Sequence, residues 1–209
     1  MLFLFRTRQT LFNFLLLFYA ALLQSRSFFL PPLETASFQG LLSFPLINWA
    51  DQQPVGAFFL RSALLFVEAI LINEIVNKNR ISGEYNLLPG LFFILVSSIL
   101  PEFIRLSPIH FINILLLLAI REIYSTYRIG DAATRIVNLG LLTGLASLFY
   151  FSSILFLVWA IAGLNIMRSL KLNEVFMLLS GFVIPYIFAG TWYFWYDNFA
   201  FFYEQQFLQ

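Results

Sequence analysis

Long apolar segments occupy almost the whole of this 209-residue sequence, and they constrain its fold more than any other feature. Apolar residues make up 60% of the chain and charged residues only 11%, which is too little polar material to cover a water-soluble surface. A helix rises about 1.5 Å per residue, so about 20 apolar residues cross a hydrocarbon core of roughly 30 Å. The sequence therefore predicts an all-α, polytopic transmembrane helical bundle that forms one transmembrane domain over residues 1–209.

Proline and polar residues divide the apolar sequence into about seven expected spans. They cover residues 10–29, 57–76, two passes between 87 and 120, two passes between 136 and 167, and 175–195. Ser107 followed by Pro108 is typical of a helix start, and it marks the returning pass of the third segment. As one helix, residues 136–167 would measure roughly 48 Å, which exceeds the core thickness. We therefore expect a turn near residues 150–153.

The basic residues predict how the bundle is oriented. With seven spans, nine of the twelve Lys and Arg residues lie on one side of the membrane; a single crossing of 136–167 would reduce this to seven. The side richer in Lys and Arg is normally cytoplasmic. We therefore expect a cytoplasmic N-terminus and an extracytoplasmic C-terminus. The nine residues are Arg6, Arg8, Lys78, Arg80, Arg121, Arg128, Arg135, Arg168 and Lys171, and the other three are Arg26, Arg61 and Arg105.

Both ends of the first span bear on its interpretation. Arg6 and Arg8 before an apolar run resemble a secretory signal peptide, but residues 21–25 contain no evident small-residue cleavage site, so we expect a retained helix.

The segment 25–56 that follows is the largest non-membrane stretch and is rich in proline and aromatic residues. We expect it to be an extracytoplasmic loop that lies on the membrane surface as short interfacial helices.

Four stretches resemble an uncharacterised family of multi-pass inner-membrane proteins of Bacteroidota. They are Phe5-Arg6, the Asn-Leu-Leu-Pro-Gly sequence at 86–90, the Ser-Ile-Leu-Pro-Glu sequence at 98–102 with Leu-Ser-Pro at 106–108, and the segment 144–150. The resemblance covers nearly the whole chain and implies a multi-pass protein of the bacterial inner (cytoplasmic) membrane, in the cell envelope. It implies no activity. Members of the family are usually longer, with further membrane helices after the equivalent of Trp195.

The loop after the first span also resembles that of membrane glycosyltransferases that use polyprenyl-phosphate sugars, as does the Gly-rich segment 140–146 before a hydrophobic helix. In those enzymes an acidic residue or pair in the first loop acts as catalytic base or metal ligand. Glu34 and Asp51 would be the corresponding catalytic residues here. They stand seventeen residues apart without an acidic neighbour, which departs from the family pattern.

Polar residues inside the expected spans are candidate functional residues, since a charged group there is costly. Arg61 and Glu68 share one face of the second span, and His110 and Asn113 share one face of the fourth. Glu68 either belongs to a proton or ion relay or fixes helix packing through a buried hydrogen bond. Because the expected depths of Glu68 and His110 differ, we expect a solitary, protonated Glu68 and an Arg61 that extends to water.

The remaining features limit the function further. Gly140 and Gly144 form a GxxxG pair that lets two helices approach closely, within the chain or with a partner. The chain has no cysteine and one histidine, so we expect no metal site and no cofactor, and its net charge of +1 gives no indication of nucleic-acid binding. We expect a non-catalytic inner-membrane subunit or scaffold of a cell-envelope, secretion or assembly complex, with membrane lipids and other membrane-protein subunits as partners. The alternatives are a polyprenyl-dependent glycosyltransferase-like protein and a small transporter.

Overall fold

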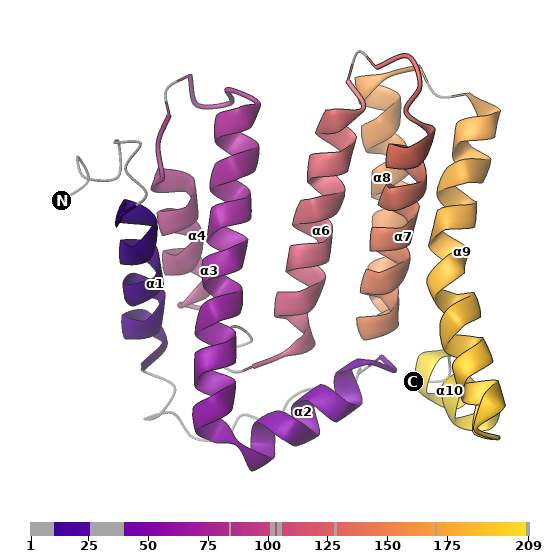
Figure 1. Cartoon of the computed structure of the whole chain (residues 1–209), viewed down its shortest axis with the longest axis horizontal. Coiled ribbons are helices and arrows are strands. Elements are labelled where there is room, and N and C mark those ends of the chain that lie inside the picture. Colours follow the sequence, from indigo (N-terminus) through magenta and orange to yellow (C-terminus); the bar gives the residue numbers. More distant parts are fainter. Residues whose placement is uncertain are drawn as a thin grey trace. The chain divides into compact units, whose positions relative to one another are not determined.

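The computed structural model describes residues 11–25, 40–83, 85–100, 103, 106–127, 129–169 and 171–207. These residues form helices and connecting turns, with no strand among them, so the predicted all-α class is confirmed. In chain order the elements are α1 (Leu11–Gln24), α2 (Ser43–Gln52), α3 (Pro54–Lys78), α4 (Leu88–Ser97), α6 (Pro108–Ser125), α7 (Ala133–Phe149), the short 3-10 helix η3 (Phe151–Ile154), α8 (Leu155–Met167), α9 (Leu172–Trp195) and α10 (Phe199–Phe207) (Figure 1).

Three of the described helices, α3, α6 and α9, are long and apolar enough to cross a membrane. Shorter apolar helices lie at residues 15–24, 88–97, 133–149 and 151–167. Many large apolar side chains are exposed on the helices, such as Phe59 on α3, Ile166 on α8 and Trp195 on α9. The chain is therefore a membrane protein built from apolar helices.

Local sequence explains where several helices begin and end. A proline occupies the first turn of α3 and of α4, and Pro108 begins α6, because proline lacks the N–H that a first turn would leave unpaired. The long apolar run 136–167 is interrupted where the sequence predicts a turn: α7 ends at Phe149 and Tyr150 has an extended backbone. Pro185 lies inside α9, which continues through it to Trp195.

The described residues form two compact units. Unit 1 takes its residues from 1–35 and 46–114, and unit 2 from 36–45 and 115–209, so α6 gives its first seven residues to unit 1. In unit 1, helices α1, α3 and α4 pack against one another (Figure 1). The buried side chains at their meeting point are Leu16, Ala20, Leu65, Ala69 and Ile94.

Unit 2 is organised around the close packing of α7 against α9. Gly140 and Gly144 of α7 both lie at this contact, where an added Cβ would collide with the backbone carbonyl oxygens of Leu178 and Phe182 respectively. Gly181 of α9 faces the other way across the contact, and a Cβ there would collide with the carbonyl oxygen of Val137. The three glycines therefore let the two backbones touch directly. The buried residues beside them include Ile136, Leu139 and Leu178.

Candidate functional site

A glutamate–histidine pair lies inside unit 1. Glu68 stands near the middle of α3 and His110 in the first turn of α6. The Glu68 Oε1 and His110 Nδ1 atoms are 3.2 Å apart, and neither side chain has any exposed surface. The ring of Phe103 packs edge-on against the imidazole, with 5.2 Å between ring centroids. Ionisable side chains in membrane helices are rare and mark functional sites by default, so this pair is the candidate site.

The expectation of a solitary Glu68 is wrong. It rested on different depths for Glu68 and His110, whereas their contact shows that α6 begins beside the middle of α3. Glu68 follows the start of α3 by fourteen residues, or about 21 Å, while His110 follows the start of α6 by only two. The depth of His110 relative to Glu68 therefore depends on the level along α3 at which α6 begins. The spacing of residues within either helix does not determine this level.

One oxygen and one nitrogen of the pair remain available for chemistry. Glu68 Oε2 and His110 Nε2 are buried and have no hydrogen-bond partner among the described residues. The two groups together can hold a proton on either side of their contact, as a neutral acid with imidazole or as a carboxylate with imidazolium. Asn113 lies one turn after His110 on α6 and is half-buried. The site could thus store or pass on a proton, or join two helices.

Arg61 lies two turns before Glu68 and does not extend to water as the sequence suggested. Its side chain is buried at 3% exposure, and Nη2 donates a hydrogen bond of 3.2 Å to the carbonyl oxygen of Gln24. Gln24 is the last residue of α1, where the helix dipole favours a cation. The guanidinium also lies over the ring of Phe58 at 5.5 Å. Arg61 therefore connects α3 to the end of α1.

Two asparagines that sequence reasoning missed attach α4 to α3. Asn73 Oδ1 accepts a hydrogen bond of 2.8 Å from the backbone N–H of Gly90, and Asn77 exchanges two hydrogen bonds with the backbone of Asn86. A Cβ on Gly90 would stand 2.6 Å from the carbonyl oxygen of Ala69, so only glycine permits this approach. The available signal was the recurrence of polar residues at 68, 73 and 77 along one apolar helix.

The other predicted site residues do not join this cluster. Asp51 is an exposed residue of α2, and Glu34 lies outside the described residues. Over the part of the chain that the structure describes, no three His, Asp or Glu side chains are grouped so as to hold a metal ion. Gly140 and Gly144 belong to the α7–α9 contact of unit 2.

Unit 2 contains a polar network of its own. The hydroxyl groups of Ser147 and Tyr186 lie 2.8 Å apart and join α7 to α9. Gln206 of α10 donates from Nε2 to the carbonyl oxygen of Ser147 at 2.8 Å, and its Oε1 accepts from the backbone N–H of Leu41 at 3.3 Å. This glutamine is 2% exposed, so the oxygen and the nitrogen of its side-chain amide both form hydrogen bonds inside the protein.

Comparison of the chain with protein-family models, with curated proteins and with solved structures finds no match.

Proposed function

We propose that this chain is a non-catalytic integral membrane subunit or scaffold of a cell-envelope, secretion or assembly complex. The observation that supports the proposal is the use of the polar side chains on α3. Arg61 bonds to the end of α1, Glu68 contacts α6, and Asn73 bonds to the start of α4. Each polar side chain joins α3 to a different helix, as expected of groups that hold a bundle together.

We further propose that the bundle has about seven spans in the bacterial inner membrane, with the N-terminus cytoplasmic and the C-terminus extracytoplasmic. The positive-inside distribution of Lys and Arg supports this orientation. The described α4 has 10 residues and covers about 15 Å, so the connection from 98 to 107 would have to complete its crossing. This connection contacts α1, because the Nε2 atom of Gln24 donates a hydrogen bond of 3.2 Å to the carbonyl oxygen of Phe103.

Site-specific photo-crosslinking tests the scaffold proposal. A photoreactive phenylalanine analogue at exposed positions Phe59 of α3, Ile166 of α8 and Trp195 of α9 samples the surfaces of three helices in living cells. A subunit should give a discrete protein adduct from one surface, and a buried control position, Leu65, should give none. Adducts to lipid alone from every exposed position, with a monodisperse monomer in mild detergent, would contradict the proposal.

A small proton-coupled transporter is the second candidate, favoured by the titratable pair with its unused Glu68 Oε2 and His110 Nε2 atoms. Glu68→Gln separates the two candidates because it keeps the shape and a hydrogen-bonding oxygen but removes the titratable group. A transporter should lose pH-gradient-driven flux in proteoliposomes while the variant still folds. A scaffold should retain both its fold and its crosslinked partner. The glycosyltransferase alternative rests on the resemblance of the first loop alone.

A further inference from the structure

Helix α10 turns back along the end of α9, a helix long and apolar enough to cross a membrane (Figure 1). Asp197, between the two helices, has a φ of 54°, the left-handed conformation of a tight turn. Phe202 of α10 then packs against Tyr193 of α9, with 6.0 Å between ring centroids. Phe207, further along α10, lies 6.3 Å from the ring of Tyr186. α10 therefore runs beside α9 from the level of Tyr193 back to the level of Tyr186.

These contacts place α10 at the depth where a membrane meets water. α9 begins at Leu172, beside the charged residues Lys171 and Glu174, which favour a position at one membrane surface. A helix rises about 1.5 Å per residue, so Tyr186 and Tyr193 lie about 21 Å and about 32 Å along α9 from that start. The hydrocarbon core is roughly 30 Å thick. α10 therefore covers the last part of the core and the opposite interface.

The end of α7, which α10 contacts through Gln206, has the hydrogen bonding that a helix end below the membrane surface requires. The last four carbonyl groups of a helix have no partner within it, and lipid supplies no water to bond with them. In α7 all four accept hydrogen bonds from protein donors. The carbonyl oxygens of Ala146, Ser147, Leu148 and Phe149 accept from the Tyr150 N–H, Gln206 Nε2, the Leu42 N–H and the Gly40 N–H respectively.

The outer side of α10 carries a stripe of exposed aromatic side chains. Phe199, Tyr203 and Phe207 follow one another at intervals of four residues and are 49%, 52% and 43% exposed. Aromatic residues are enriched where lipid headgroups meet acyl chains. Glu204 is the single charged residue of α10, and residues 172–207 contain no Lys or Arg. The stripe therefore suits a lipid surface and offers no cation to an acidic partner.

We propose that α10 is a re-entrant helix whose aromatic stripe is inserted into the lipid bilayer. Phe199, Tyr203 and Phe207 contact acyl chains near the headgroups, and the opposite side of α10 holds the end of α7 through Gln206. Glu204 lies about 100° around the helix from Tyr203 and faces the water among the headgroups. Because the stripe has no cation, its insertion does not require anionic lipid.

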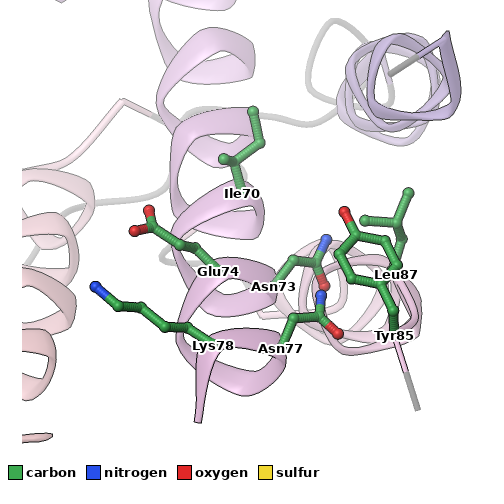
Figure 2. A pocket seen from close by; sticks show the side chains of 7 residues that line it. All are labelled: Ile70, Asn73, Glu74, Asn77, Lys78, Tyr85 and Leu87. Carbon is green, nitrogen blue, oxygen red and sulfur yellow. The ribbon is translucent and has the colours of Figure 1, made fainter. Parts of the chain in front are cut away.

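Hydroxyl-radical footprinting of the unaltered full chain in nanodiscs tests this placement. Tyr85 is the control of the same residue type, since it lines an open pocket of about 490 Å³ with charged walls and is 38% exposed (Figure 2). In water Tyr203 would react faster than Tyr85, because it is the more exposed side chain. We expect Tyr203 to react at least about fivefold more slowly, because lipid excludes water.

Two footprinting results would overturn the proposal. Modification of Tyr203 at the rate of Tyr85 or faster would show that the stripe faces water. Protection in phosphatidylglycerol nanodiscs but not in phosphatidylcholine nanodiscs would contradict insertion that is independent of headgroup charge.

Spin labels distinguish a lipid cover from a protein cover, and the chain has no cysteine to interfere. A nitroxide on Tyr203→Cys should collide more often with oxygen, which concentrates among acyl chains, than with a water-soluble nickel complex. The neighbouring Glu204→Cys should show the reverse order. Low access of both reagents at position 203 would contradict the proposal: dipolar broadening would then assign the stripe to a second copy of the chain, and its absence to the protein interior.

Circular dichroism shows whether each labelled variant keeps its helices, and footprinting of the unaltered chain decides the matter if one does not. The proposal does not depend on the scaffold function, since both measurements use the purified chain.

Discussion

The Glu68 carboxyl and the His110 imidazole, 3.2 Å apart and fully buried, each replace water as the other's hydrogen-bond partner. Removing one partner should leave the other unsatisfied, so we expect His110→Ala to lower the free energy of unfolding by about 1–3 kcal/mol. Glu68→Gln should change it by less than about 1 kcal/mol, because the amide oxygen can still accept from Nδ1. Reversible unfolding by SDS in mixed micelles measures both, with the exposed Glu204→Gln as the control. Equal stability of the His110→Ala variant and the unaltered chain would show that the pair does not hold α3 and α6 together.

Gln206 makes a second residue-scale prediction. Its side chain satisfies the carbonyl oxygen of Ser147 and the N–H of Leu41, so Gln206→Ala would leave two buried backbone groups without partners. We expect a loss of about 1–3 kcal/mol of unfolding free energy for each unsatisfied group, less whatever water can recover. Gln52→Ala removes an exposed glutamine of α2 and should have no effect. If the two variants gave similar unfolding curves, water would have to replace the hydrogen bonds of Gln206, which would contradict a buried network.

At the scale of elements, backbone contact between α7 and α9 depends on Gly140, Gly144 and Gly181. A methyl group at any of them meets a carbonyl oxygen of the opposite helix, so each Gly→Ala change should separate the helices and cost about 1–3 kcal/mol. Gly190→Ala is a matched control in α9, because its Cβ would lie 4.0 Å from the Phe199 ring, an ordinary contact. That variant should be neutral or more stable by up to about 1 kcal/mol through helix propensity. Unfolding in detergent, followed by tryptophan fluorescence, compares the four variants. A neutral Gly140→Ala would contradict direct backbone packing.

At the scale of the whole molecule, the absence of cysteine makes topology directly measurable, since single cysteines can be introduced without background. Ser82, Gly130 and Ser169 are exposed residues between helices and should be cytoplasmic; Ser152 and Asn198 should be extracytoplasmic. A membrane-impermeant maleimide applied to intact spheroplasts should label cysteines at the last two positions only, and should label all five after lysis. Labelling of Ser152→Cys and Ser169→Cys from the same side would mean that residues between them do not cross the membrane.

Local sequence by itself determined the helical class, the start of α6 at Pro108 and the interruption at Tyr150, because apolar composition, proline and turn residues act over a few neighbouring positions. Only the tertiary structure decided which polar side chains meet. Glu68 and His110 are 42 residues apart, and Ser147 and Gln206 are 59 apart. Helical periodicity indicates which face of a helix a residue occupies. The level at which one helix passes another depends on how their apolar faces pack and on the segment that connects them. For that reason the sequence identified Glu68 and His110 as candidates but assigned them different depths. It gave no indication that Gln206 would form hydrogen bonds with the backbone of Ser147 and of Leu41 in unit 2.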